Sequence, residues 1–391
     1  MNAAALPGSS DTAPFIAVTG GTGLLGSYLV RDLLVAGRNV ALVVRRDRKR
    51  SAATRVEAVV RHWEETLETS LPRPVVLEGD LAQPFCGLAE EDRQWLHWNC
   101  SALLHNAASL SFRGADRAAE PWLTNVTGTA HAIDLARAAD IEHFHHVSTA
   151  YVCGLREGTV LEDDLDVGQP FGNDYETSKC AAEKMVREAG FESATVYRPS
   201  IIVGDSETGY TSTYHGFFAG LRLGHTLLTR VAKGSTSGPA LLALIGVNQA
   251  DRKNFVPVDW VSAVIAHAVQ TPGARGRTYH LTHPDPLSMR TVGRIIQEAV
   301  ETFSVAASPD DPDRCDERWF ADNLRSQLDV YQSYFRNDPV FDRRHTESLA
   351  SHLPCPPLDD PTLLRMSQFA IECDFGRRPT RATSPSGVAA S

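Results

Sequence analysis

The sequence predicts an α/β protein with a doubly wound parallel sheet and a smaller, discontinuous lobe toward its C-terminus. Three observations support this fold class. Short apolar runs alternate with helical patterns through the first half of the chain. The runs are continuously apolar, as in strands covered on both faces. A glycine-rich loop joins the first run to the first helical stretch. Regular strand–helix alternation produces a parallel sheet with helices on both faces.

The first half of the chain supplies the strands and helices of this sheet. The apolar run FIAVTG (15–20) is the first strand, and a helical pattern follows at 24–36. NVALVVR (39–45) is the second strand, and the stretch 51–68 is an amphipathic helix. Similar patterns predict further strands at 74–80, 102–108, 143–149 and 194–200, and further helices at 120–139 and 175–189.

The alternation ends after Pro199, where the second lobe begins. Residues 204–250 are rich in glycine, serine and threonine, and KGSTSG (233–238) has the composition of a mobile loop. FVPVDWVSAVIAHAV (255–269) predicts a turn into an apolar helix, and RTYHLTH (277–283) another strand. The C-terminal third has a helical pattern, with an acidic, proline-containing interruption at 308–317.

The composition disfavours several classes of protein. A formal net charge of −10 disfavours general binding to nucleic acid or to anionic membranes. Seven cysteines without a C-x-x-C pair predict reduced thiols. No run approaches the ~20 apolar residues of a membrane span. The N-terminal stretch MNAAALPGSSDTAPF lacks the basic and apolar regions of a signal peptide. We therefore expect a cytoplasmic protein without nucleic-acid partners.

The loop TGGTGLLG (19–26) follows the first strand and opens a helix. Gly20, Gly23 and Gly26 are three residues apart, and glycine is required where the chain turns tightly and where backbone approaches a pyrophosphate. The helix N-terminus adds N–H groups and a positive dipole end. In this context the loop predicts dinucleotide binding, with Thr22, Leu24 and Leu25 also at the cofactor.

The end of the second strand bears on which dinucleotide is bound. NAD-binding proteins place an acid there to hold the ribose 2′-hydroxyl. Here Arg45 and Arg46 follow the strand, and the first acid is Asp47. Two guanidinium groups suit a 2′-phosphate, which they bind bidentately, so the sequence favours NADPH. The alternative is a solvated basic turn.

These assignments divide the chain into a core and a lobe. We expect a Rossmann-type nucleotide-binding domain from 14–204 plus 251–275, and a substrate-binding lobe from 205–250 plus 276–378. The small, polar composition of 1–13 and 379–391 predicts disordered tails.

Two further motifs carry titratable and hydroxyl groups. HVSTAYVCG (146–154) brings Ser148 and Thr149 to the end of a predicted strand, and doubly wound sheets place ligands there. In DYETSK, Tyr175 and Lys179 lie four apart at the start of a helix. Taken alone, such a pair is most often a surface contact. A lysine ammonium beside a phenol lowers the pKa of tyrosine from ~10, and the phenol can then exchange a proton near neutral pH.

Taken together, the motifs resemble those of the extended short-chain dehydrogenase/reductases. The markers in order are TGGTGLLG, GDL (79–81), NAA (106–108), VSTAYV (147–152), YETSK (175–179) and YRPS (197–200), and the resemblance continues through FVPVDWV. GDLAQPFCGLAEEDRQWL, HNAASLSF and VSTAYVCG are most similar to the thioester-reductase and fatty-acyl-reductase (male-sterility-type) group. DVYQSYFRNDPVFD (329–342) resembles the C-terminal part of some acyl reductases.

The resemblance implies roles for individual residues. Tyr175 would be the acid that protonates a carbonyl oxygen, and Lys179 would also hold the nicotinamide ribose. Thr149 would hydrogen-bond the same oxygen, with Ser148 as its competitor for that role. We expect further contacts with the cofactor from Asp80, Leu81, Asn106, Ala107, Ala108, Asn125, Ser148, Tyr197, Arg198, Pro199 and Ser200.

Signals for the substrate are weaker, and each has a structural alternative. Phe112, Tyr151 and His215 are candidate substrate contacts; Phe112 is equally compatible with a core position, and His215 more so with a local hydrogen bond. Phe217, Phe218 and the run 241–247 would form either an apolar acyl channel or the core of the lobe. His143 and His145 share a face of one predicted strand, but the sequence shows no ligand spacing that completes a metal site, and we expect none.

The leading interpretation is an NADPH-dependent reductase of an acyl thioester, which gives an aldehyde or an alcohol. The thioester would arrive as a CoA ester or on a separate carrier protein, although an acidic chain is not an obvious partner for acidic carriers. Reduction of a ketone, or oxidation of an alcohol, needs the same catalytic residues. A nucleotide-sugar enzyme is disfavoured by Arg45 and Arg46, and a dinucleotide-sensing regulator by the intact Tyr175–Lys179 pair. We expect a monomer or a homodimer.

Overall fold

The structure is a computed structural model that describes residues 14–114, 116–229, 247–304 and 336–378 of the 391-residue chain. The body of the molecule comes from the first half of the chain. Its strands are β1 (Phe15–Thr19), β2 (Val40–Val44), β3 (Val75–Glu78), β4 (Cys100–His105), β5 (His143–Val147) and β7 (Ser193–Pro199). Its helices are α1 (Leu24–Val35), α2 (Ala52–Leu67), α3 (Glu90–Asn99), α4 (Gly128–Ala138) and α5 (Asp174–Glu188), with short helical turns at Pro84–Gly87, Leu123–Thr127 and Ala150–Cys153.

The remaining elements are shorter strands and the helices of the second half. The strands are β6 (Thr159–Val160), β8 (Ile201–Val203), β9 (Arg252–Lys253), β10 (Phe255–Pro257), β11 (Thr278–Leu281), β12 (Leu287–Ser288) and β13 (Val340–Phe341). The helices are α6 (Phe217–Leu228), α8 (Val258–Gln270), α9 (Met289–Phe303), α11 (Arg344–Ala350) and α12 (Asp360–Glu372), with short turns at Pro272–Ala274 and Asp374–Gly376.

A seven-stranded sheet of order β3-β2-β1-β4-β5-β7-β11 forms the centre of the molecule. Every neighbouring pair in it is parallel, and β1 aligns Ile16 with Val40 of β2 on one side and with Ala102 of β4 on the other. The strand order reverses between β1 and β4. In open α/β sheets, ligands bind beyond the carboxyl ends of the strands at such a reversal. The predicted doubly wound parallel sheet is confirmed.

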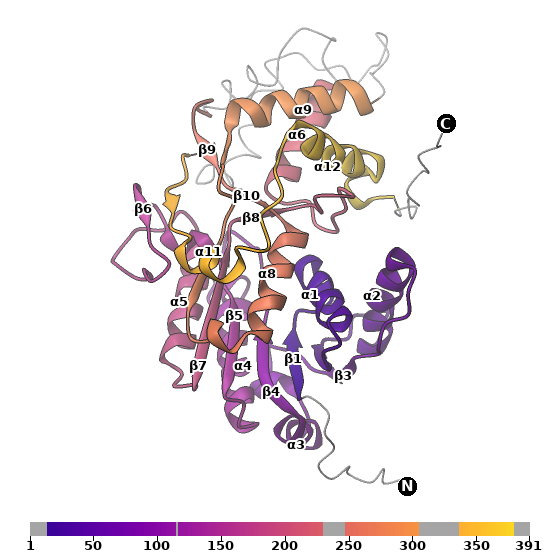
Figure 1. Cartoon of the computed structure of the whole chain (residues 1–391), viewed down its shortest axis with the longest axis vertical. Coiled ribbons are helices and arrows are strands. Elements are labelled where there is room, and N and C mark those ends of the chain that lie inside the picture. The colour runs from indigo at the N-terminus through magenta and orange to yellow at the C-terminus, as the bar shows by residue number, and fades with distance from the viewer. Residues whose placement is uncertain (1–13, 115, 230–246, 305–335, 379–391) are drawn as a thin grey trace.

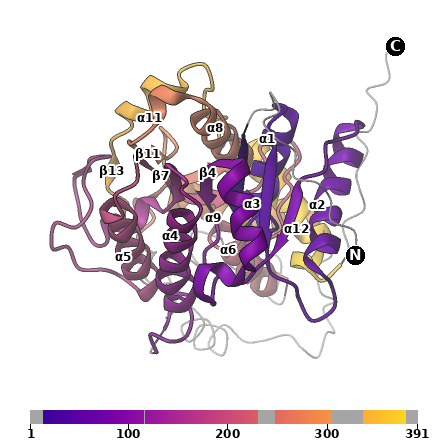
Figure 2. The same ribbon diagram turned by 90° about the horizontal axis from the view of Figure 1, so that it is seen from below.

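The sheet is covered by helices on both faces because its side chains are apolar in both directions. On β2, Val40, Leu42 and Val44 pack with α1, α2 and α8, whereas Ala41 and Val43 pack with α3, α4 and α5. Figure 2 shows α3, α4 and α5 together on one side of the sheet, with α1 and α8 on the other. The layers fix the strand ends relative to one another, and these ends carry the site described below.

The lobe begins where the chain leaves the central sheet at Ser200. β8 follows β7 almost directly, but it pairs in parallel with β10 rather than with a strand of the central sheet. Beyond this pair, α6, α9 and α12 surround an apolar core that includes Phe218, Leu221, Ile295 and Leu363. In Figure 1 the lobe lies at the top of the view, above the carboxyl ends of the central strands.

The structure moves two of the expected boundaries. β11 lies within the predicted lobe range 276–378 but pairs with β7, with Thr278 beside Val196, so it belongs to the central sheet. The predicted turn before the apolar helix of 255–269 is the strand β10, because it finds a partner in β8. Both pairings join segments distant in sequence, which local patterns do not reveal.

Several expectations fall outside the described residues. These are the tails 1–13 and 379–391, the loop 233–238, most of the run 241–247, the interruption 308–317 and the first part of 329–342. Within the described ranges, no helix is long and apolar enough to cross a membrane. The cysteines of the described part are all free.

Candidate functional site

A cavity of about 1410 Å³ lies between the carboxyl ends of the central strands and the lobe. Residues that follow β1, β2, β4, β5 and β7 line one part of it, and residues of α6 and α9 line another. Pockets for single small ligands occupy about 300–1,000 Å³. This cavity is therefore large enough for a dinucleotide together with a second ligand.

The glycine loop forms the floor of the cavity beside β1. Gly20 has a φ of +73°, and a Cβ there would lie 2.6 Å from the backbone nitrogen of Ala107, so a side chain is excluded. A Cβ on Gly26 would meet the Gly20 carbonyl oxygen at 2.0 Å, and that contact packs α1 against the loop. At Gly23 the nearest such atom is 3.5 Å away, and Gly23 lines the cavity.

Gly23 is also the N-cap of α1, and no side chain caps this helix end. The first N–H groups of a helix have no partner within the helix, and they attract anions. The segment after β4 is held beside the glycine loop, because the Asn106 side-chain amide donates to the Gly20 carbonyl at 3.2 Å. The loop therefore offers the open backbone surface that a pyrophosphate needs, and a dinucleotide fits it.

Arginine side chains gather at the end of the cavity beside β2. Arg45 and Arg55 both line it, whereas Arg46 does not. Arg55, on α2, donates to the Thr22 hydroxyl at 2.7 Å and to the Arg45 carbonyl. The Asp47 carboxylate accepts the backbone N–H groups of the turn that follows it, and Asp47 does not line the cavity.

The N-terminus of α5 places Tyr175 in the cavity. Asn173 caps this helix by accepting the Glu176 backbone N–H at 2.9 Å, and the Glu176 carboxylate in return accepts the Gly172 backbone N–H at 2.8 Å. This is a variant of the capping box, with asparagine at the N-cap and glutamate three residues later, in which the glutamate accepts the N–H of the residue before the cap. It fixes the first turn of the helix, to which Tyr175 belongs.

Thr149, Tyr175 and Lys179 meet in the middle of the cavity, and all three are buried. Thr149 follows β5, and its hydroxyl donates to the Pro199 carbonyl at 3.4 Å. A hydrogen bond joins the side chains of Tyr175 and Thr149. Lys179 lies one turn further along α5, and its Nζ donates to the Val147 carbonyl at 2.8 Å.

The titration of this group differs from the sequence-based expectation. Burial raises the pKa of Tyr175 to about 12, although its side-chain hydrogen bond with Thr149 lowers it. Burial also lowers the pKa of Lys179 to about 8, while Glu183 raises it. The expected lowering of the tyrosine pKa by Lys179 is absent in the protein alone: burial dominates the shift of Tyr175, and the Lys179 Nζ is bonded to the Val147 carbonyl.

Most of the predicted site residues line this single cavity. The cofactor candidates that do so are Gly20, Thr22, Gly23, Leu24, Leu25, Arg45, Asp80, Leu81, Asn106, Ala107, Ala108, Ser148, Pro199 and Ser200. The catalytic candidates Thr149, Tyr175 and Lys179 and the substrate candidates Phe112, Tyr151 and His215 lie on it as well.

Four predicted cofactor residues lie elsewhere. Arg46 is exposed and faces Glu78 at 3.8 Å. Tyr197 and Arg198 are fully buried: the Tyr197 hydroxyl is bonded to His145 at 2.9 Å, and the Arg198 guanidinium is paired with Glu183 at 2.7 Å. Successive side chains of a strand point to opposite faces of the sheet. The side chains of Tyr197 and Arg198 therefore lie against the two faces and not at the carboxyl edge, where the cavity is.

Asn125 is the fourth of these residues, and it supports the cavity from behind. Its side-chain amide donates to the Ser109 carbonyl at 3.0 Å and to the Ser178 hydroxyl at 3.0 Å. The Ser178 hydroxyl in turn donates to the Tyr175 carbonyl at 2.8 Å. Asn125 thus ties the loop after β4 to the helix that carries Tyr175.

Sequence reasoning missed the residues that reach the cavity from distant elements. Arg55 comes from the amphipathic helix α2, and its position in the sequence does not distinguish it from the other charged residues of that helix. Ile201 and Ile202 come from β8, and Met289 and Val292 from α9. Of the suggested acyl-channel residues, Phe217 lines the cavity, whereas Phe218 and Val247 belong to the core of the lobe.

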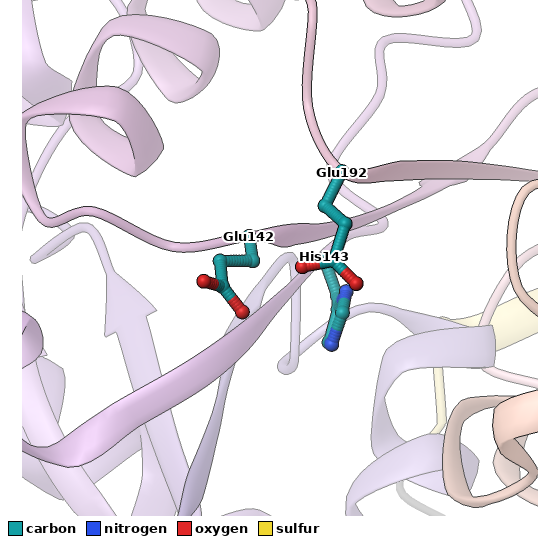
Figure 3. Close-up of side chains that lie close together, drawn as sticks. All are labelled: Glu142, His143 and Glu192. Carbon is teal, nitrogen blue, oxygen red and sulfur yellow. The ribbon is translucent and has the colours of Figure 1, made fainter.

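The histidines of β5 lie away from the cavity. Glu142, His143 and Glu192 come together where β5 and β7 begin, with potential ligand atoms within 4.8 Å of one another (Figure 3). Two carboxylates therefore approach His143, a grouping that the spacing of ligands along the sequence does not reveal. The His143 Nδ1 atom is bonded to the Ser193 hydroxyl at 3.2 Å, and Arg275 adds positive charge nearby. Both features oppose a cation there, and the absence of a metal stays a prediction.

Comparison with known proteins relates this geometry to a family. The family model described as male sterility protein matches residues 18–265. Non-reducing polyketide synthase pkiA of Emericella nidulans is 32% identical over 312 residues, which are 74% of this chain and 11% of the relative. Aldehyde reductase lnaA of Aspergillus flavus is 31% identical over 299 residues, which are 70% of this chain and 26% of the relative. The chain thus spans only a small part of these relatives.

Solved structures resemble the whole chain. The terminal R domain from the myxalamid PKS-NRPS biosynthetic pathway superposes with a TM-score of 0.73 at 25% identity, covering 96% of this chain and 95% of that one. The reductase domain of a nonribosomal peptide synthetase from Mycobacterium tuberculosis has the same fold, with a TM-score of 0.64 at 22% identity and coverage of 95% and 94%. The chain belongs to the male sterility protein family, in the thioester-reductase group of the extended short-chain dehydrogenase/reductases, which are NAD(P)-dependent oxidoreductases.

Proposed function

We propose that this protein uses NADPH to reduce an acyl thioester, and that Tyr175 is the proton donor. The observation that carries the proposal is the position of Thr149, Tyr175 and Lys179. They lie in one cavity, between a glycine loop suited to a dinucleotide and an apolar region of the lobe. A carbonyl group bound there would lie beside both the hydroxyls and the cofactor.

The preference for NADPH rests on the arginines beside β2. Arg45 and Arg55 line the end of the cavity that the adenosine ribose would occupy, and Asp47 is held in a turn outside it. Guanidinium groups bind phosphate with two parallel hydrogen bonds, whereas a ribose 2′-hydroxyl needs an acceptor such as a carboxylate. Arg55 replaces Arg46 in the pair that we expected from the sequence.

The residues of the chain then have distinct tasks in the reaction. When bound, NADPH supplies a hydride to the carbonyl carbon. Tyr175 is protonated at neutral pH, and its phenol would donate a proton to the carbonyl oxygen as negative charge develops there. The Thr149 hydroxyl holds the same oxygen. Cleavage of the carbon–sulfur bond releases a thiol and leaves an aldehyde, and a second hydride would give an alcohol.

The relatives suggest how the substrate arrives. A thiolation-reductase di-domain of an archaeal nonribosomal peptide synthetase shares the fold, with a TM-score of 0.68 at 16% identity. We propose that the acyl group is presented to this chain as a thioester of a carrier protein or of CoA. Reduction of a free carbonyl compound is the second candidate, and the similarity to aldehyde reductase lnaA favours it.

The test is to follow nicotinamide absorbance with purified protein, NADPH or NADH, and either an acyl-CoA or the matching ketone or aldehyde. We expect oxidation of NADPH with the acyl-CoA. In Tyr175→Phe we expect kcat to fall by roughly 10²–10⁴-fold, because general acid catalysis contributes that much. Binding of NADPH to the variant, measured by fluorescence titration, should persist. Turnover of the free carbonyl compounds alone would refute thioester reduction.

A further inference from the structure

The part of the cavity that lies in the lobe is a groove between α6 and α9. Four residues of α9 line it, at spacings that put them on one face of the helix: Met289, Val292, Gly293 and Ile296. The facing side of α6 and the residue before it contribute Gly216, Ala219, Gly220 and Leu223 at the same spacings. These eight positions are apolar or small, whereas Arg222, His225 and Thr226 of α6 line the cavity with polar side chains beside them.

The two helices approach each other closely at Gly224 of α6. A Cβ at this position would lie 2.3 Å from Cγ2 of Ile296, so only glycine permits the crossing. One turn earlier, a Cβ on Gly220 would meet a single atom within 4 Å, the Ile296 Cδ1 at 3.6 Å, which is an ordinary contact. Packing therefore requires glycine at Gly224 but does not require it at Gly220.

Gly220 lines the cavity from the second turn of α6. Glycine is a poorer helix former than alanine, so it lowers the stability of the helix at this position. A side chain longer than alanine at this position would extend into the groove. The missing side chain leaves space that a ligand can use. At this position a residue with a side chain would make the helix more stable, whereas glycine keeps the groove open. The chain has glycine here.

The groove begins close to the catalytic hydroxyls. Gly216, just before α6, lies against Ile201, since a Cβ there would be 2.5 Å from Cγ2 of that residue. Ile201 directly follows Ser200 and the Pro199 carbonyl that accepts from Thr149. From this end, α6 leads past Gly220 to the crossing at Gly224. A chain attached to a carbonyl at Thr149 and Tyr175 has this path available.

We propose that the groove between α6 and α9 receives the apolar acyl chain of the substrate, and that Gly220 determines how long a chain is accepted. The inference rests on the proposed function and makes it more specific: the substrate class is a medium- or long-chain acyl thioester. Short acyl groups end before Gly220 and do not depend on it.

The test compares Gly220→Leu with the wild type on butanoyl-CoA and dodecanoyl-CoA, and Gly220→Ala is the matched control. Each methylene excluded from an apolar site lowers binding roughly fourfold, so a leucine that displaces three or four of them should lower kcat/KM for dodecanoyl-CoA by about 10²-fold. The value for butanoyl-CoA should change by less than about threefold. Gly220→Ala should stay close to the wild type with both substrates, because its Cβ has room.

A second variant guards against a folding defect in the first. Leu223 lies one turn further along α6 and already carries a side chain, so Leu223→Trp narrows the groove without replacing a glycine. This variant should show the same loss of kcat/KM for dodecanoyl-CoA and no loss for butanoyl-CoA. Equal loss for both chain lengths, or no loss for dodecanoyl-CoA in either variant, would overturn the assignment of the groove.

Failure of the proposed function would be recognised separately. If the wild type reduces no acyl-CoA, thioester reduction falls, and the groove is then judged from binding alone. The probe is S-dodecyl-CoA, a thioether that cannot be reduced, titrated by calorimetry in the presence of NADP⁺. Binding that is weakened about 10²-fold by Gly220→Leu, but not by Gly220→Ala, supports the groove; equal binding to all three proteins refutes it.

Discussion

At the catalytic end of the cavity, burial acts in opposite senses on two titratable residues one helical turn apart. It raises the pKa of Tyr175 to about 12 and lowers that of Lys179 to about 8, because each loses hydration of its charged form. The phenol keeps its proton at neutral pH, but the raised pKa makes it a weaker acid than a tyrosine in water. A bound dinucleotide adds charges and hydrogen-bond partners, so these values describe the protein before the cofactor arrives.

The buried Lys179 gives the cofactor-free protein a measurable pH dependence. Its pKa is about 8 in the folded state and 10.5 for a lysine in water, so between these pH values the unfolded chain holds a proton that the folded protein has released. Stability due to this residue therefore rises with pH through that window and is constant below it. The rise should be on the order of 3 kcal/mol.

The measurement is urea unfolding of wild type and Lys179→Met from pH 7 to pH 10, each point giving a free energy of unfolding. Groups other than Lys179 titrate in both proteins, so the difference between the two curves reports on the lysine. We expect the wild type to gain stability relative to the variant as the pH rises above about 8. Curves that stay parallel would contradict a lowered pKa.

Arg55 and Arg46 form a matched pair for testing the choice of cofactor. Both are arginines near the end of β2, but only Arg55 lines the cavity. A charge-assisted hydrogen bond to phosphate contributes about 1.5–3 kcal/mol, so Arg55→Gln should weaken NADPH binding roughly 10- to 100-fold. Binding of NADH should change little, and Arg46→Gln should leave both unchanged. Equal weakening of both cofactors in Arg55→Gln would mean that this arginine only supports the loop through Thr22.

At the scale of single elements, the first turn of α5 shows how local sequence positions the proposed proton donor. Asn173 and Glu176 satisfy backbone N–H groups at the helix start, and Tyr175 lies between them. Replacement of an N-cap asparagine by alanine typically costs about 1 kcal/mol. Asn173→Ala should lower the free energy of unfolding by that amount in urea titrations. Asn173→Ser, which keeps an acceptor oxygen, should restore most of the loss, and similar values for both variants would show that the cap is not what stabilises the turn.

The elements also separate what local patterns reveal from what they do not. The strands β1 to β5 and β7 and the helices α1, α2, α4 and α5 were predicted because each carries its own apolar period, and the glycine loop because its spacing has a direct steric reason. Helix α3 and the two-residue strand β6 were not predicted. β11 was predicted as a strand at 277–283, but its place in the central sheet, like the short pair β8–β10, depends on partners far apart in the sequence. The side of the sheet that Tyr197 and Arg198 face depends on register at the end of β7. Arg55 depends on the angle at which α2 lies over β2.

The site was predictable to the same degree. Motifs at strand ends, such as those of Thr149 and Asn106, reach the cavity because all carboxyl ends of a parallel sheet share one edge. The lobe has no such rule. Residues of α6 and α9 face each other through tertiary packing alone, and neither Gly220 nor Met289 is marked by a motif. The balance between desolvation and charge at Tyr175 likewise requires the depth of burial, which the sequence does not contain.

At the scale of the whole molecule, two regions of different construction meet at one cavity. The sheet contributes fixed strand ends held by apolar cores on both faces. The lobe contributes helices with a core of their own, joined to the sheet through β8 and β10. In this arrangement, substitutions in α6 or α9 can change which substrate is accepted without changing the surface at the strand ends. The Gly220 variants test this separation.

The pairing of β11 with β7 also has a consequence for how the chain folds. The two strands are neighbours in space, but the helix α6 and the β8–β10 pair lie between them in sequence, so this contact has a high contact order. Such contacts form late, because a long loop must close first. Until β11 arrives, the outer edge of β7 presents unpaired backbone groups, which other chains can pair with. A nascent or truncated chain that ends before Thr278 is therefore exposed to aggregation at this edge. By pairing with β7, β11 prevents other chains from pairing with that strand.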